Sequence, residues 1–344
     1  MSGLRILAMR RAAMVMAGAL GVALTAAMPA MAQDQKTFTM KLSTATINDS
    51  QHEWMKMFVA AVEKDSGGRI KGEIYPASQL GSIPRQIEGT QFGSIQGWIG
   101  PPEFLVGVDD RFEVLSAPGL FTSMKHADRV IKDPQFQKPL LALGANKGLV
   151  GISLFISAPS AFNTRTPVRH LADLKGKKIR VLASPMQNEQ ITRLGGTPVA
   201  LTLGDVLPAL QQGTIDGAVS TVPVFAAFQY YDAAKYMTET EHSYVFSVAE
   251  MSKKWLDSLP PDLQKIIIDE GAKMGEAITP WQFDFYDRGR KIWVDKGGEL
   301  IKLPPDEEAA MLEKLGSVGE DISKTRPPLK EIYDVMVAAV KRDK

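Results

Sequence analysis

Two stretches of this chain, 120 residues apart, carry the same short phrase in the same setting. Gly93-Ser94-Ile95-Gln96-Gly97 and Gly213-Thr214-Ile215-Asp216-Gly217 each follow an expected helix and open an expected strand. A glycine just past a helix end supplies the left-handed conformation that closes the helix. A glycine inside a strand indicates backbone that another segment approaches closely. The pair predicts two similarly built α/β lobes, although two unrelated turns would also produce one matching phrase.

The segments around each phrase alternate between strand and helix patterns. Strands are expected where apolar and polar residues alternate or apolar residues run together, and helices where apolar residues recur on one face. Around the first phrase we expect strand 38–43, helix 54–62, strand 71–75, a helix from a Ser82 cap to Gly93, and strand 94–99. Around the second we expect strand 177–182, a helix up to Leu194, strand 197–201, helix 205–212 and strand 214–219.

The last third of the chain has a mainly helical pattern. It runs from about 260 to 295, with Pro280 as a candidate kink. We interpret the charged stretches 306–308 and 324–330 as solvated surface.

The first 32 residues have the pattern of a secretory signal peptide. Arg5, Arg10 and Arg11 precede a 17-residue apolar run over 12–28, and Pro29-Ala30-Met31-Ala32 ends it. A membrane anchor is the alternative, because 17 residues lie at the lower end of the spanning range of about 17–25. The cleavage triplet favours removal, so we expect a soluble exported protein, located in the periplasm, that begins near Gln33.

Composition narrows the function. The chain has no cysteine, which excludes thiolate metal sites and cysteine nucleophiles, and a net charge of +1 argues against nucleic-acid binding. The four histidines are far apart in sequence, and no phosphate-binding loop or nucleophile motif is present. We therefore expect no metal, no cofactor and no catalytic residue, a profile that favours a ligand-capturing protein over an enzyme.

Three phrases resemble those of the DctP-type solute-binding proteins of tripartite ATP-independent periplasmic (TRAP) transporters. They are 68–81 (GRIKGEIYPASQLG), 174–181 (LKGKKIRV), and 194–199 (LGGTPV) followed by 209–217 (ALQQGTIDG). The resemblance implies a two-lobed α/β periplasmic binding fold of type II character, with strands that cross twice and a long C-terminal helix spanning both lobes. It also implies a carboxylate ligand closed between the lobes and delivery to paired membrane subunits. We expect a monomer, with lobe I over 33–157 and 246–285 and lobe II over 158–245 and 286–344.

Arg180 is the principal site residue that the resemblance implies, because the arginine of the "K-I-R-V" phrase holds the ligand carboxylate in that family. The residue pattern agrees. On an alternating strand, Arg180 lies near the carboxyl end, where open α/β sheets bind ligands. Its planar guanidinium can donate two parallel hydrogen bonds to a carboxylate, which a lysine cannot reproduce. A structural ion pair is the alternative role.

This chain departs from the family pattern at two polar positions. Ser220 stands where many members have an asparagine that contacts the ligand, and Ser160 stands where some have a second arginine, with Arg165 and Arg169 only nearby. Fewer polar contacts predict a monocarboxylate with an apolar or aromatic body. By the same alignment, the further candidate ligand contacts are Trp98, Phe155, Phe225 and Tyr244, each of which could equally be core packing, and more weakly Thr46 and Ser157.

Two other functions stay open at this point. An exported α/β enzyme, such as a lyase or hydrolase, would use the same scaffold and would convert its ligand. A binding protein that serves a sensor instead of a transporter would have the same sequence features.

Overall fold

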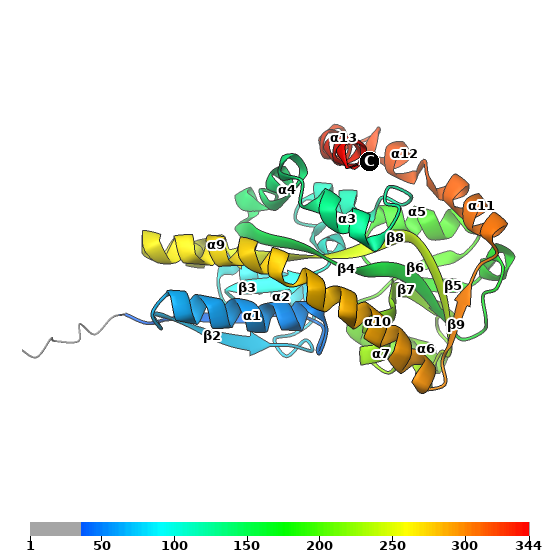
Figure 1. Ribbon diagram of the computed structural model, residues 1–344, viewed down its shortest axis with the longest axis horizontal. Coiled ribbons are helices and arrows are strands. Elements are labelled where there is room, and N and C mark those ends of the chain that lie inside the picture. Colours follow the sequence, from blue (N-terminus) through cyan, green and yellow to red (C-terminus); the bar gives the residue numbers. More distant parts are fainter. Residues whose placement is uncertain (1–35, 344) are drawn as a thin grey trace, which may run out of the picture. The chain divides into compact units, whose positions relative to one another are not determined.

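The computed structural model describes residues 36–343, and the predicted signal peptide lies outside them. No helix in this described part is long and apolar enough to cross a membrane. One sheet organises the described chain, with strand order β2-β1-β3-β8-β4-β7-β5-β6 and β9 (Glu299–Lys302) beside β8 (Figure 1). The expected α/β class is confirmed.

The two ends of the sheet are built in the same way. In each, the first strand of a parallel trio is central, the second is outermost and the third faces the middle of the sheet. The first trio with its helices is β1 (Phe38–Ser43), α1 (Ser50–Asp65), β2 (Ile70–Tyr75), α2 (Ile83–Phe92) and β3 (Gly97–Gly100). The second is β5 (Lys178–Val181), α5 (Pro185–Arg193), β6 (Thr197–Ala200), α6 (Leu203–Gln212) and β7 (Gly217–Thr221).

Both glycines of the repeated phrase have the roles that the sequence predicts. Gly93 and Gly213 close α2 and α6 with φ of 84° and 72°. A Cβ on Gly97 would lie 2.7 Å from a Leu42 methyl group, and one on Gly217 would lie 2.7 Å from the Asn163 carbonyl oxygen. Ser82 is the N-cap residue of α2 as expected, but its side chain makes no capping hydrogen bond.

Two long antiparallel strands join the halves of the sheet. They are β4 (Leu149–Thr164) and β8 (Tyr236–Ser252), of 16 and 17 residues. The early part of β4 lies beside the late part of β8 next to β3, and its late part lies between β7 and the early part of β8. Their pairing is irregular near the middle, between Ile156 and Ala158 and again between Pro159 and Ala161.

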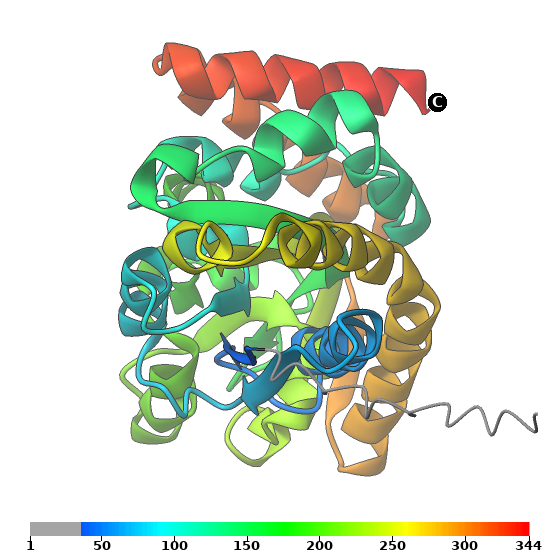
Figure 2. The same cartoon turned by 90° about the vertical axis from the view of Figure 1, so that its left-hand side faces the viewer.

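The helical pattern over 260–295 forms two helices rather than one. The helices α9 (Pro261–Ala277) and α10 (Thr279–Asp295) meet at Ile278, where the i to i−4 hydrogen bonds continue, and Pro280 lies in the first turn of α10. Because proline has no N–H and crowds the preceding turn, it explains the break. The helix α9 packs on β4 and α1, and α10 packs on α7 (Val222–Ala227), so together they span the two halves (Figure 2).

The interpretation of 324–330 as solvated surface is wrong in part. Leu329 is fully buried, and Arg326 pairs with a buried carboxylate, Glu113. The C-terminal helix packs against α3, α4 and the 3-10 helix η2, all of which precede β4 (Figure 2). The remaining helices are η1 (Pro102–Leu105), η2 (Asp110–Ser116), α3 (Met124–Ile131), α4 (Pro134–Leu141), η3 (Ala145–Lys147), η4 (Leu171–Leu174), α7 (Val222–Ala227), η5 (Tyr230–Asp232), α8 (Lys253–Leu256), α11 (Pro305–Leu315), α12 (Val318–Ser323) and α13 (Pro327–Arg342).

Candidate functional site

A cavity lies where the two halves of the sheet meet. The first residues of α2 and α6 line it, together with residues from the middle of β4 and β8, and it holds about 460 Å³ of space free of protein atoms, part of it open to solvent. Its walls are mainly apolar, with few polar side chains. Its lining residues are Ala45, Thr46, Gln51, Ile83, Trp98, Ile99, Gly100, Pro101, Phe104, Ser157, Arg180, Leu182, Leu203, Ser220, Val224 and Val245.

Arg180 is the only charged residue in this lining, and only 2% of its surface is exposed. Its Nε donates to the Leu201 carbonyl oxygen at 2.9 Å, and Nη1 donates to the Val219 carbonyl oxygen at 3.3 Å. Both acceptors are neutral, and no carboxylate among residues 36–343 lies within ion-pair distance of the guanidinium. Nη2 therefore keeps its donors for another acceptor.

Burial of Arg180 without an ion-pair partner changes its pKa. Loss of hydration lowers the pKa of Arg180 to about 10, which still leaves it fully protonated at neutral pH. The same burial raises the pKa of the neighbouring Tyr230 to about 12, so that residue stays neutral. The cavity thus holds one positive charge, with no ion-pair partner in the described chain, in a largely apolar wall. Such a site attracts a single anionic group, because a charge is costly to bury unpaired.

A second polar group, Gln51, enters the cavity from the first turn of α1. Its Oε1 accepts hydrogen bonds from the hydroxyl groups of Thr44 at 2.6 Å and Thr46 at 3.1 Å. These two donors fix the amide orientation and point its NH₂ group elsewhere. Asp49, the N-cap of α1, is also buried, and desolvation raises its pKa to about 6.

Trp98 forms part of the apolar wall. Its indole Nε1 is buried without a hydrogen-bond partner in the described chain. Gly100 makes room for this ring, since a Cβ there would lie 2.3 Å from the indole. Ser220, on β7, is 7% exposed, and Ser157, in the middle of β4, shares a 2.9 Å hydrogen bond with Ser247.

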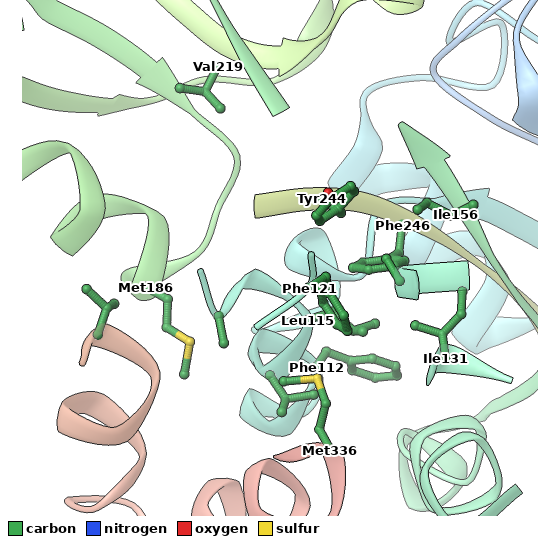
Figure 3. Close-up of a cluster of buried hydrophobic side chains, with 14 of the residues drawn as sticks. Phe112, Leu115, Phe121, Ile131, Ile156, Met186, Val219, Tyr244, Phe246 and Met336 are labelled. Carbon is green, nitrogen blue, oxygen red and sulfur yellow. The ribbon is translucent and has the colours of Figure 1, made fainter. Parts of the chain in front are cut away.

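Five of the eight residues predicted to contact the ligand thus line one cavity, and three do not. Phe155 stacks on Trp54 in the core under α1, with ring centroids 6.1 Å apart, and Phe225 packs on Tyr230 at 5.3 Å. Tyr244 lies edge-on to Phe121 in the largest core cluster (Figure 3). The alternative role, core packing, describes where these three side chains lie.

The other basic residues of the region lie away from Arg180. Ser160, at the position of a second family arginine, accepts a hydrogen bond from Ser243. Arg169 pairs with Glu299 at 2.6 Å. Neither Arg165 nor Arg169 lines the cavity, so no second cation replaces the missing arginine in it.

Several lining residues were not predicted from the sequence. Gln51 lies on a helix whose apolar pattern identifies only the residues that face the core. A single polar residue such as Gln51 does not by itself indicate a ligand contact. Ile83 and Leu203 occupy equivalent places, each as the first residue of the helix that ends in the repeated phrase. That symmetry was a usable signal for both.

Comparison with known proteins places the chain in a family. Residues 43–325 match the model of the bacterial extracellular solute-binding protein family 7, DctP. YiiZ of Salmonella typhimurium is 30% identical over 60% of this chain, and the match spans 63% of that protein, slightly under two thirds of its length.

Solved structures of TRAP periplasmic solute-binding proteins share the fold. One from Desulfovibrio salexigens, with bound orotic acid, has a TM-score of 0.85 and 22% identity over 90% of this chain and all of that chain. One from Xanthobacter autotrophicus Py2, with bound β-D-galacturonate, has a TM-score of 0.81 and 27% identity over 87% of this chain and 99% of that chain. The chain therefore belongs to the DctP family of bacterial extracellular solute-binding proteins, which serve TRAP transporters.

Proposed function

We propose that this protein captures an organic acid in the periplasm by closing two lobes around it, and that Arg180 pairs with the ligand carboxylate. The observation that carries the proposal is a guanidinium that is 98% buried in a cavity wall, with no carboxylate of the described chain within ion-pair distance. A periplasmic location agrees with the DctP family, whose Rhodobacter capsulatus member is a C4-dicarboxylate-binding periplasmic protein 24% identical to 91% of this chain.

The ligand carboxylate would complete the hydrogen bonding of Arg180. Nη2 has free donors, and the Ser220 hydroxyl and the Gln51 amide line the same cavity. When the lobes close and water leaves, the ion pair strengthens because the effective dielectric constant falls. Binding energy would thereby be coupled to closure, and the closed form would be the one presented to the membrane subunits.

We propose that the ligand is a monocarboxylate with an apolar or planar aromatic body. One cation faces the cavity, and eight large apolar residues line the cavity: Ile83, Trp98, Ile99, Phe104, Leu182, Leu203, Val224 and Val245. A sugar acid would need partners for several hydroxyl groups, and each unpaired one would cost about 1–3 kcal/mol. Galacturonate and orotate, the ligands of the two structural neighbours, are therefore informative competitors.

Isothermal titration calorimetry with a panel of carboxylates tests the proposal. The panel contains benzoate, phenylacetate, orotate, D-galacturonate and succinate. We expect the aromatic monocarboxylates to bind most tightly. Stronger binding of galacturonate or succinate would reject the ligand class but leave carboxylate capture standing.

Arg180→Ala tests the carboxylate contact itself. Truncation of one partner of a buried charged pair costs about 2–5 kcal/mol, which is roughly 30- to 4000-fold in Kd. Arg169→Ala removes an exposed arginine from the same lobe and is the matched control. Unchanged binding by Arg180→Ala would reject the site. Recovery of the bound ligand unchanged after denaturation would separate capture from an enzymatic role.

A further inference from the structure

Two fully buried carboxylates lie ten residues apart in the chain, on the two 3-10 helices that follow β3. Glu103 belongs to η1 and Glu113 to η2, and neither has any exposed surface. Both contact the first turn of α5, the helix that follows the Arg180 strand. The positive end of a helix dipole favours anionic groups at such a place.

The two carboxylates differ in how well they are compensated. Glu113 Oε1 accepts from the Met186 backbone N–H at 2.5 Å, and its Oε2 lies 2.6 Å from Arg326 Nη2. Glu103 Oε1 accepts only neutral donors, Ser116 Oγ at 3.2 Å and Gln187 Nε2 at 3.5 Å. Its Oε2 has no hydrogen-bond partner in the described chain.

Glu103 is also connected to the cavity in two ways, through residues next to it in the chain and through the side chain of one of its hydrogen-bond donors. Its chain neighbours Pro101 and Phe104 line the cavity that contains Arg180. Its donor Gln187 accepts a 2.9 Å hydrogen bond from the backbone N–H of Leu182, another lining residue. The charge of Arg180 favours ionised Glu103, but burial outweighs it and raises the pKa of this carboxyl to about 7.

Other cations lie on the elements packed against η1, but Arg85 on α2 is exposed and Arg111 on η2 is paired with Asp109. Glu113 acts in the same direction as burial, and its own charge is paired with Arg326. On β8, which packs against η1, burial lowers the pKa of His242 to about 4 and raises that of Glu250 well above its ordinary value. His242 is therefore neutral near pH 7, burial favours the neutral form of Glu250, and Arg180 is the cation to which Glu103 responds.

We propose that Glu103 is a proton-binding site coupled to Arg180, and that its protonated fraction rises, with protons taken up from water, when a carboxylate binds there. The inference rests on the proposed function and adds a second, unassigned site to it. The ligand's negative charge cancels the field of Arg180 at Glu103, so the ionised form of Glu103 keeps its neutral hydrogen-bond donors but loses the stabilisation that this positive charge supplied. Ligand affinity must then rise as the pH falls through neutrality, because the bound state holds more protons than the free state.

The coupling can be measured without any ligand. Carbon-13 NMR of protein labelled at the glutamate carboxyl carbons, with the Glu103 signal assigned by its loss in Glu103→Gln, follows the titration of this one group. We expect Glu103 to titrate near pH 7 and its midpoint to rise by at least 1 pH unit in Arg180→Met. Arg290→Met removes an arginine that is paired with Glu239 on the other half of the sheet, and it should leave the midpoint unchanged. A midpoint near pH 4–5 in the unaltered protein, or no rise in Arg180→Met, would overturn the inference.

A second experiment uses benzoate and orotate as probes. Calorimetry at pH 7.5 in phosphate and in Tris, whose ionisation enthalpies differ, reports the protons taken up per ligand bound. We expect a buffer-dependent heat that corresponds to a fraction of a proton, and no such dependence in Glu103→Gln. Binding with identical heats in the two buffers would overturn the proton coupling and leave the proposed function intact. If neither probe binds, the NMR titration still decides the coupling by itself.

Discussion

Arg180 is a costly residue for the ligand-free protein to keep. A buried guanidinium that has only neutral carbonyl acceptors has lost its hydration without gaining an ion pair. By contrast, Arg290 is 37% exposed and pairs with Glu239, a buried carboxylate that also accepts from Tyr286. The two arginines therefore predict opposite effects on stability when their charge is removed.

Arg180→Met should stabilise the ligand-free protein. An apolar side chain of similar length removes the desolvation cost, and replacing buried charges by well-packed apolar groups gains about 1–4 kcal/mol where it succeeds. Arg290→Met should instead destabilise the protein, because it leaves Glu239 buried and unpaired. Urea unfolding of both variants at pH 7 measures the two free energies of unfolding. A loss of stability in Arg180→Met as large as in Arg290→Met would show that Arg180 serves the fold rather than a ligand.

The sequence predicts a ligand contact well where the type of residue has few structural roles. An arginine at the end of a short parallel strand has few structural roles, and Arg180 lies in the cavity. Aromatic side chains serve the core and ligand sites equally well, and the face on which a strand or helix residue lies decides between them. Phe155 and its neighbour Ile156 lie on opposite faces of β4. The sequence does not show which of these two faces borders the cavity.

At the scale of elements, the repeated phrase determines how tightly the strands of each half pack. Gly97 and Gly217 are equivalent in sequence, but their surroundings differ. Gly97 is approached by the ends of the Leu42 and Met251 side chains, whereas Gly217 is approached by the Asn163 carbonyl oxygen as well as by the Thr164 methyl group. Side-chain ends can rotate away from an added methyl group, but backbone in the middle of a sheet cannot.

Gly217→Ala should therefore destabilise the protein more than Gly97→Ala does. Overpacking costs about 1–3 kcal/mol where the neighbours cannot move, and less where side chains adjust. Gly204→Ala is the control, because Gly204 lies in α6 with no atom within 4 Å of an added Cβ. It should stabilise the protein by about 0.5–1 kcal/mol through helix propensity. Thermal unfolding of the three variants gives the order, and equal losses at 97 and 217 would contradict it.

The elements of both βα halves were predictable because each is local. Their strands and helices have alternating or one-sided apolar patterns, and glycines mark their ends. The residues between the halves were not predictable in the same way. Segment 102–148 folds into short helices whose burial depends on α13, some 200 residues later in the chain. The length of β4 and β8 depends on their pairing with each other, which periodicity in either segment does not reveal.

At the scale of the whole described chain, the middle of β4 and β8 is the natural place for a hinge. The pairing of these strands is irregular around 156–161, and Glu241 on β8 has a φ of 47°, in the left-handed region. The predicted division of the lobes at 157/158 and 245/246 falls at the same level of both strands, and it remains a prediction. Because α13 contacts α3, α4 and η2, we propose that this helix moves with lobe I rather than with lobe II.

The absence of cysteine from the chain makes the hinge directly measurable. Glu88 on α2 and Gln212 on α6 are exposed, and the opposite ends of these two helices line the cavity. The distance between spin labels on Glu88→Cys and Gln212→Cys, measured by pulsed electron–electron double resonance, should therefore report the opening of the cavity. We expect the ligand-free protein to populate a longer and a shorter distance, corresponding to an open and a closed arrangement. A saturating carboxylate from the panel should leave only the shorter distance in the doubly labelled protein that keeps Arg180. It should not do so when Arg180→Ala is added, because a ligand can shift an equilibrium only by its differential affinity for the two states. A single distance that stays the same when a ligand binds tightly would mean that capture proceeds without hinge closure.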